Sequence, residues 1–338
     1  MGTQAAKSID NAGMPLVVDA SHLLIPHAGR STPACRASQL NLRLPHLETL
    51  LARMVPVDSD TQEITTLSPP HERALARALD LGAPDGRLPW AALEAAQASL
   101  TVPSAGEGWS FVTLCHWDVA IDEVILGDPA SLQVDETESH ALLAAARPFF
   151  EEDGIALYSS SQPGYWLGRS ALFEGLPTAS LDRAAEQPIS AWSAGTKDQR
   201  ALRRLENEMQ MLLYTQRVND ERTAKGLPSI NSFWLSGTGV LPENVDIRRP
   251  RPKVDARLRD PALQDDGAAW VAAWQAIDAG PVAELAAALA RGEAITLTLC
   301  GDRGAQRWQP RASGFGAWLK SLRTMLRRPR LADLLEAL

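Results

Sequence analysis

Acidic and histidine side chains that could bind a metal ion follow a short apolar segment near the start of the chain. The run Met14–Val18 is predicted to be a buried strand, and Asp19 and His22 come directly after it, with His27 further along. In open α/β sheets, ligands bind at the loops that follow the strands. Asp302 follows a later predicted strand. Asp19, His22 and Asp302 are therefore candidate metal ligands, and a purely structural role for them is the alternative.

A glycine-containing segment is the main candidate for binding an anion. Ile230–Leu235 is predicted to be a strand that ends in Ser-Gly-Thr-Gly, whose backbone N–H groups could form an anion nest. The segment lacks the spacing and the lysine of a P-loop, and a tight turn is the alternative. Arg222 could add a bidentate contact, or it could form a salt bridge at a helix end. The candidate ligands here are Asn219, Arg222, Asn231, Gly237 and Gly239.

One serine stands beside an acidic residue and is a candidate nucleophile. Ser59 precedes Asp60, which could place a hydroxyl group next to a carboxylate. A turn or a helix N-cap explains the same pair equally well. No Gly-x-Ser-x-Gly motif occurs elsewhere in the chain.

Two groups of predicted elements would position these residues. Residues 105–230 are expected to form an inserted α+β domain, because strands and helices with few polar loops alternate there. Residues 1–104 and 231–338 are expected to form the core from both ends of the chain. The predicted strands are Phe111–Leu114, Val124–Leu126, Ile155–Tyr158 and Ala294–Leu299, and the predicted helices span 47–54, 71–81, 136–150, 202–214 and 270–289.

Composition excludes several classes of protein. The chain has 338 residues and a formal net charge of −8, which makes nucleic acid an unlikely partner. No apolar run is long enough for a membrane span, and three dispersed cysteines indicate neither a disulfide framework nor a zinc-thiolate site. A cytoplasmic location is expected. The basic segment Lys320–Arg330 could dock a protein partner or form a solvated helix face, and Arg248–Lys253 is expected to be an extended loop.

Several motifs resemble a known family when taken as a set. The chain resembles the RpfE-type regulatory proteins of proteobacteria, which are similar to archaeal-type cofactor-independent phosphoglycerate mutases. The resemblance implies an alkaline-phosphatase-like α/β fold, a mixed sheet flanked by helices with a smaller inserted domain, and in the mutases two divalent metals and a serine nucleophile. The motifs are LPHLETLLARM, SPPHERALARALDL, LCHWDV, NEMQMLLYTQRVND and SINSFWLSGTG.

The predicted metal site is incomplete when its ligands are counted. The mutases end their late strand in Asp-His, whereas this chain has Asp302-Arg303, and no histidine follows His140. An arginine cannot donate a lone pair to a metal, but Arg303 could bind an anion. We therefore expect a non-catalytic regulatory or anion-binding protein without a cofactor. The alternative is an active phosphomutase or phosphatase that uses two divalent metals, manganese or zinc.

Overall fold

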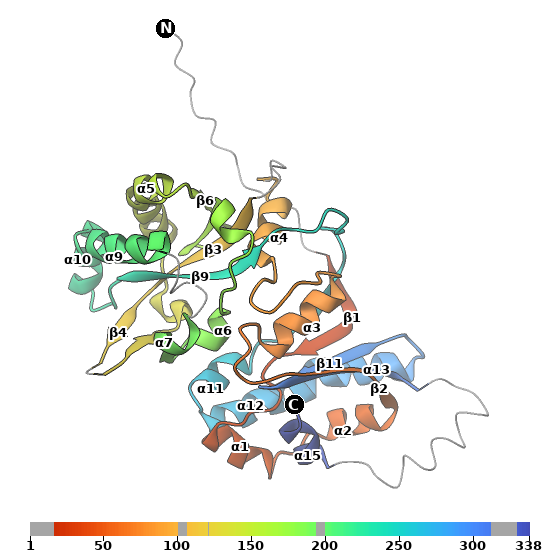
Figure 1. Ribbon diagram of the computed structural model, residues 1–338. Coiled ribbons are helices and arrows are strands. Elements are labelled where there is room, and N and C mark those ends of the chain that lie inside the picture. Colours follow the sequence, from red (N-terminus) through yellow and green to blue (C-terminus); the bar gives the residue numbers. More distant parts are fainter. Residues whose placement is uncertain (1–16, 101–106, 121, 194–199, 312–329) are drawn as a thin grey trace. The chain divides into compact units, whose positions relative to one another are not determined.

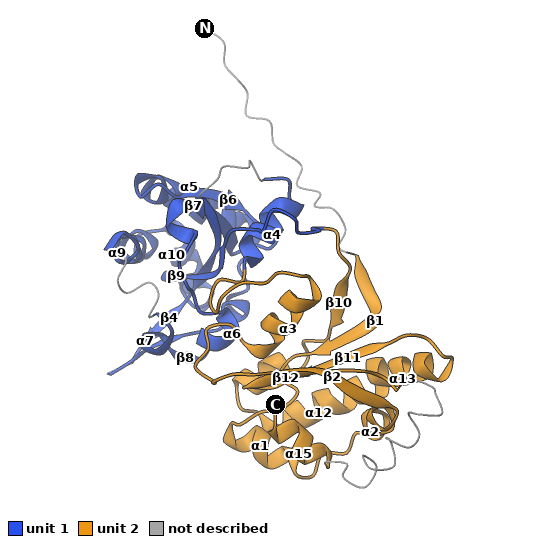
Figure 2. Cartoon of the chain, turned by 45° about the vertical axis from the view of Figure 1, so that its right-hand side comes forward, with its two compact units in different colours: residues 1–16, 89–247 blue, residues 17–88, 248–338 orange. Residues whose placement is uncertain are grey.

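The computed structural model describes residues 17–100, 107–120, 122–193, 200–311 and 330–338. These residues form two compact units, which Figure 2 distinguishes by colour. Residues 89–247 of the described chain form unit 1. Unit 2 combines residues 17–88 with the described residues after 247, so its sheet is assembled from segments that are far apart in sequence.

Unit 2 is built on a mixed five-stranded sheet. Its strands are β1 (Val18–Ile25), β2 (Met54–Thr61), β10 (Arg251–Val254), β11 (Thr296–Cys300) and β12 (Gly304–Pro310). The order across the sheet is β10-β1-β11-β12-β2. Strand β1 is parallel to β10 and β11, and β12 is antiparallel to β11 and β2. The predicted α/β class, with a mixed sheet flanked by helices, is confirmed.

Alternation along β11 places Leu297 and Leu299 on one face of the unit 2 sheet and Thr298 on the other, and Figure 1 shows the sheet between helices. Leu297 and Leu299 belong to the main core, and the face of Thr298 is the polar face. The polar face is covered by helix α3 (Pro70–Ala78), whose Ala74 and Leu75 pack on the sheet. The helices that pack with the apolar face are α1 (Pro33–Gln39), α2 (Pro45–Ala52), α11 (Arg259–Leu263), α12 (Gly267–Ile277), α13 (Ala283–Ala290) and α15 (Leu331–Glu336).

Unit 1 contains a four-stranded antiparallel sheet between helices. Its strands, in spatial order, are β6 (Ala156–Ser159), β7 (Tyr165–Ser170), β3 (Gly108–Cys115) and β9 (Ser232–Gly239). One face packs against the helices α5 (Glu136–Glu152) and α9 (Arg200–Tyr214). The other face packs against α4 (Trp90–Gln97). The smaller elements of unit 1 are β4 (Trp117–Val119), β5 (Val124–Leu126), β8 (Gln187–Pro188), α6 (Leu181–Ala184), α7 (Ile189–Trp192) and α10 (Arg217–Ala224).

The boundaries of the units differ from the predicted ones. The structure divides the chain at 88/89 and 247/248, whereas the sequence predicts divisions at 104/105 and 230/231. The reason is strand pairing, because β9 runs along β3 and belongs to the sheet of unit 1. Helix α4 packs on the same two strands and therefore also belongs to unit 1.

Two segments have a different secondary structure from the predicted one. The first strand is Val18–Ile25, so Asp19 and His22 lie within it and do not follow it. The prediction for 14–16 lies outside the described residues. Arg251–Val254, within the segment expected to be a loop, pairs with β1 as an edge strand.

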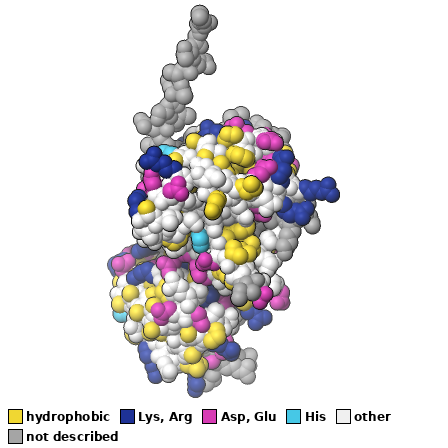
Figure 3. All heavy atoms as spheres, turned by 90° about the vertical axis from the view of Figure 1, so that its left-hand side faces the viewer, with side chains coloured by type: hydrophobic (Ala, Val, Ile, Leu, Met, Phe, Trp, Pro, Cys, Tyr) yellow, Lys and Arg dark blue, Asp and Glu magenta, His cyan; other side chains and the backbone are white. Residues whose placement is uncertain are grey.

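On the face drawn in Figure 3, basic and acidic side chains of the described residues are interspersed, and they do not form a single basic patch. No helix among the described residues is long and apolar enough to cross a membrane. The predicted docking segment Lys320–Arg330 lies outside the described residues, except for the exposed Arg330. Its role as a docking segment stays a prediction.

A buried aspartate caps one of the core helices of unit 2. The carboxylate of Asp278 is 3% exposed and accepts hydrogen bonds from the backbone N–H groups of Leu47 and His46 at 2.7 and 3.2 Å. We expect Asp278→Ala to lower the free energy of unfolding by about 1–3 kcal/mol, because two buried donors lose their acceptor. Chemical denaturation measures this loss.

The exposed cap Asp266 provides the matched control. It accepts hydrogen bonds from the N–H groups of Ala268 and Ala269 at the start of α12. Because water can replace its carboxylate, Asp266→Ala should cost only about 1 kcal/mol. Equal losses for the two variants would contradict a special role for the buried cap.

Candidate functional site

The predicted anion ligands of unit 1 are parts of its internal framework. The guanidinium group of Arg222 is fully buried, and it donates to Glu138 Oε2, the Pro228 carbonyl and the Leu132 carbonyl, each at 2.7 Å. The amide of Asn219 bonds both the N–H and the C=O of Ile230. These contacts assign both side chains a structural role.

The remaining candidates of unit 1 lie in or beside strand β9. Asn231 bonds the N–H and the C=O of Trp117. Gly237 and Gly239 are residues of the strand, and the pairing of β9 with β3 has an irregularity between Ser236 and Gly239. Gly237 has a φ of 61°, and an added Cβ would lie 2.9 Å from the Phe111 ring. The glycine is therefore explained by a close approach inside the sheet.

In unit 2, the carboxylate of Asp60 is bound by two arginines of helix α3. Arg73 Nε donates to Asp60 Oδ2 at 2.7 Å, and Arg77 Nη2 donates to the same oxygen at 3.1 Å. Arg73 also donates to the carbonyl of Ser68, so its buried charge is well satisfied. Ser59 is exposed, whereas Asp60 is 8% exposed, as expected for neighbours on opposite faces of a strand. The predicted serine–carboxylate pair therefore does not form.

The second candidate carboxylate, Asp302, is also bound by an arginine. Arg30 Nη1 donates to Asp302 Oδ1 at 2.5 Å. The backbone N–H and the hydroxyl group of Ser31 donate to Oδ2 at 2.7 and 2.5 Å. Asp19 lies on β1, the strand of His22, and accepts hydrogen bonds from the N–H and hydroxyl groups of Ser21.

The two divalent metals implied by the resemblance do not fit these residues. A pair of metals needs several carboxylate or imidazole ligands with available lone pairs. Asp60 and Asp302 each accept charge-assisted hydrogen bonds from arginine, and the positive charge of the arginines opposes a cation there. The Nε2 of His22 lies 2.9 Å from the hydroxyl group of Thr298.

A shallow cavity that is open to solvent lies between α3 and the sheet, and its enclosed part has room for about one water molecule. Small side chains leave this space free, namely Ala74 and Ala78 on the helix and Ala305 on β12. The polar side chains that line it are His22, Asp58, Arg77, Thr298 and Arg307. The strand register brings three of these side chains together, because Thr298 pairs with Arg307 and Arg307 pairs with Asp58.

Charged side chains of both signs line the cavity. Asp58 Oδ2 is 3.9 Å from both Arg77 Nε and Arg307 Nη2, which is beyond hydrogen-bond distance. Among the described residues, Asp58 is the one polar partner of the Arg307 guanidinium group. Of the side chains that line the cavity, Arg77 and Arg307 are positive and Asp58 is negative, and the carboxylate of Asp19 acts on His22 from the same strand.

Arg303, the predicted anion ligand of this unit, does not line the cavity. Its side chain is exposed, and its backbone N–H group donates to the Leu338 carbonyl at 2.8 Å. Sequence reasoning missed Arg307 and Arg77, which line the cavity instead. The spacing of Arg73 and Arg77 on a predicted helix was the one available signal that both could reach the same carboxylate.

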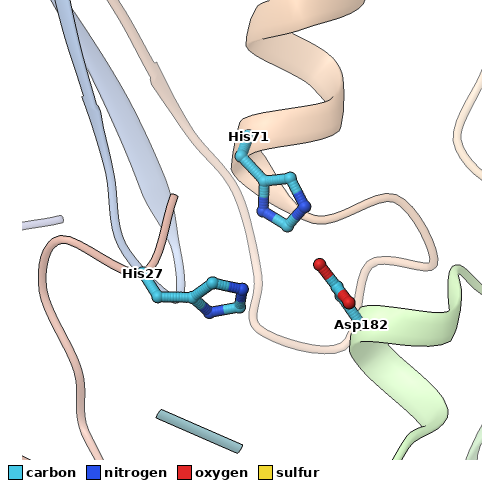
Figure 4. A group of neighbouring side chains, drawn as sticks. All are labelled: His27, His71 and Asp182. Carbon is cyan, nitrogen blue, oxygen red and sulfur yellow. The ribbon is translucent and has the colours of Figure 1, made fainter. Parts of the chain in front are cut away.

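Two histidines of unit 2 form a second candidate site. The ring centroids of His27 and His71 are 5.2 Å apart, and Figure 4 shows the two imidazole rings beside one another. One ring nitrogen of each lies within 4.8 Å of the other. His71 lies in the first turn of α3, and His27 follows β1. The sequence analysis named His27 as a possible metal ligand and missed His71.

Comparisons with known proteins show similarity to two solved structures. No family model matches the chain, and no curated protein matches it. The chain is similar to the PH0037 protein from Pyrococcus horikoshii, with a TM-score of 0.44 and 11% identity over 87% of this chain and 88% of that chain. It is also similar to the cofactor-independent phosphoglycerate mutase from Thermoplasma acidophilum, with a TM-score of 0.34 and 14% identity over 87% and 90% of the two chains. Both likenesses concern the path of the chain alone, and membership of the RpfE-type family stays a prediction.

Replacing Arg222 should destabilise unit 1. We expect Arg222→Met to lower the free energy of unfolding by about 3–5 kcal/mol, because Glu138 and two carbonyl groups lose a buried partner. The matched control is Arg217→Met, which removes an exposed ion pair with Glu221 on the same helix and should cost less than about 1 kcal/mol. Urea unfolding of both variants measures the difference, and similar losses would refute the structural role.

The stability of unit 2 should depend on the protonation of His22. The pKa of His22 is lowered from 6.5 to about 4, mainly because the ring is buried; the carboxylate of Asp19 opposes this shift and the charge of Arg307 adds to it. The unfolded chain therefore takes up this proton first, and the free energy of unfolding falls as the pH drops from 6.5 to 4. The loss is at most about 3 kcal/mol. We expect His22→Gln to flatten this part of the stability profile, and an unchanged slope would contradict the assignment.

Proposed function

We propose that this protein binds a small anionic ligand in the cavity beneath α3 and does so without catalysing a reaction on it. The observation that carries the proposal is the guanidinium group of Arg307, which lines the cavity and has a single, distant acidic partner. A guanidinium group binds phosphate and carboxylate oxygens through paired N–H donors. Arg77 offers a second positive group at the same cavity.

The shape of the cavity favours a small ligand. Much of its volume is the open mouth, and its enclosed part is narrow. Its floor is formed by the hydrogen-bonded side chains of His22 and Thr298. Because the low pKa of His22 keeps the ring uncharged at neutral pH, the two arginines supply the attraction for an anion. A phosphoryl or carboxylate group at the mouth is the chemistry that matches these donors.

Two sets of contacts support a non-catalytic role over the active phosphomutase. Asp60 and Asp302 are engaged by arginines, and Ser59 points away from Asp60. A metal-dependent phosphoryl transfer would need these groups as ligands and nucleophile. Under the proposal, the protein does not interconvert phosphoglycerates when manganese or zinc is supplied. Measurable turnover would overturn the non-catalytic part.

The anion site is tested with inorganic phosphate as the probe. We expect phosphate to raise the melting temperature of the wild-type protein, because a ligand that binds the native state stabilises it. Arg307→Gln should weaken phosphate binding by about tenfold, which corresponds to the loss of one charge-assisted contact. Isothermal titration calorimetry and thermal melts measure both effects.

Arg303→Gln is the matched control, since it removes an exposed arginine from the turn between β11 and β12 without changing the cavity. It should leave phosphate binding unchanged. Loss of binding in Arg303→Gln, with retention in Arg307→Gln, would place the anion at Arg303 and refute the cavity. An equal stabilisation by sodium chloride at the same ionic strength would indicate charge screening only.

A further inference from the structure

We propose that two copies of this chain associate through helix α9, with the two α9 helices side by side and antiparallel. Figures 1 and 2 show α9 at the margin of unit 1, where it contacts α5 and β9. The face toward these elements buries Leu202, Leu205, Met209 and Leu213. The opposite face, here called the α9 stripe, exposes Arg200, Arg203, Arg204, Asn207, Met211 and Tyr214.

The last turns of the α9 stripe expose two large side chains to solvent. Met211 is 74% exposed and Tyr214 is 86% exposed, and they lie three residues apart, on the same side of the helix. Methionine and tyrosine are enriched in protein interfaces, and tyrosine is among the residues that contribute most to binding there. Covering these side chains with a partner removes apolar surface from water and is favourable.

The first turn of the α9 stripe is basic, which opposes the electrostatics of the helix. Arg200 and Arg203 lie in this turn, and no acidic residue accompanies them. The helix dipole favours acidic side chains at this end and disfavours cations. These arginines therefore do not serve the stability of the isolated helix. Their guanidinium groups are available to a partner surface.

The two halves of the α9 stripe face one another when one copy is turned end to end. Arg200 and Tyr214 are each seven residues from Asn207. Arg203 and Met211 are each four residues from it. An antiparallel pair with the two Asn207 residues at its midpoint therefore sets Arg200 against the partner's Tyr214 and Arg203 against the partner's Met211. Such a two-fold contact is self-complementary.

The chemistry of the facing side chains selects the antiparallel orientation. A guanidinium group over a tyrosine ring forms a cation–π contact, and the two Asn207 carboxamides can exchange N–H···O hydrogen bonds. A parallel pair would instead set Arg200 against the partner's Arg200, and like charges repel.

Opposite charges also meet on one flank of the antiparallel pair. Arg204 and Glu208 lie on the same flank of the α9 stripe, and Arg204 Nε is 3.7 Å from Glu208 Oε1. With a rise of 1.5 Å per residue, reversal brings Arg204 to about 3 Å, measured along the helix axis, from the partner's Glu208. The pair can therefore also form ion pairs between the copies.

The proposed contact is a small interface. A helix of 15 residues is about 22 Å long, so we expect a weak and reversible dimer. The α9 stripe lies within unit 1 and shares no residue with the anion cavity. The inference therefore does not depend on the proposed function.

Sedimentation velocity measurements on the full chain test this surface. We expect the wild-type protein to dimerise reversibly as its concentration rises toward about 100 µM. Tyr214→Lys should raise the dissociation constant at least about tenfold, because an ammonium group then faces the partner's Arg200. Adding Arg200→Glu to Tyr214→Lys should restore dimerisation, because a carboxylate then faces that ammonium group. Circular dichroism verifies the fold of each variant.

Val119→Lys is the matched control, because Val119 is 80% exposed and lies in the same unit on β4, outside α9. It should leave the dissociation constant unchanged. The proposal is overturned if the wild-type protein stays monomeric over this range, if Tyr214→Lys dimerises as the wild type does, or if Val119→Lys weakens dimerisation equally. Failure of Arg200→Glu to restore dimerisation of Tyr214→Lys would refute the antiparallel register.

Discussion

The buried ion pair between Arg73 and Asp60 holds helix α3 on the polar face of the unit 2 sheet, and both candidate sites of that unit depend on this placement. A buried ion pair is favourable only when its remaining donors are satisfied, and Arg73 meets this condition through the carbonyl of Ser68. The helix carries His71 at its start and Arg77 near its end. One interaction therefore sets the position of the His71 ring and of the Arg77 guanidinium group.

The same chemistry that stabilises the fold also removes the metal site expected from the resemblance. Arginine satisfies the carboxylates of Asp60 and Asp302 permanently, because its charge does not titrate in the physiological range. A divalent cation would have to displace these bonds. The positive charge that remains, at Arg307, suits a negatively charged ligand.

The periodicity of the sequence predicted helices and strands, but it did not predict which residues come together in the candidate sites. The helical pattern of Leu202–Tyr214 and the apolar run Val124–Leu126 coincide closely with α9 and β5. The glycines at the end of β9 were predicted to form a loop that binds an anion. Gly237 is instead a strand residue, where a Cβ would clash with the Phe111 ring. The sequence around Arg222 does not indicate whether its side chain is buried or exposed. Its structural role becomes evident only from its contact with Glu138, which is distant in sequence. The register of three strands places Thr298, Arg307 and Asp58 side by side in the cavity. These residues are far apart in sequence, so no local sequence motif predicts their proximity.

The interleaved order of the two units has a consequence for synthesis of the chain. Leu23 on β1 pairs with Leu297 on β11, a separation of 297 − 23 = 274 residues. At typical translation rates, β1 therefore leaves the ribosome roughly 14 to 55 s before this partner exists. Unit 1 is encoded between them and has all its strand partners within residues 89–247, so it can fold first. Until β10 and β11 have been made, the apolar end of β1, Leu23–Ile25, has no strand partner, and the nascent chain is then exposed to aggregation.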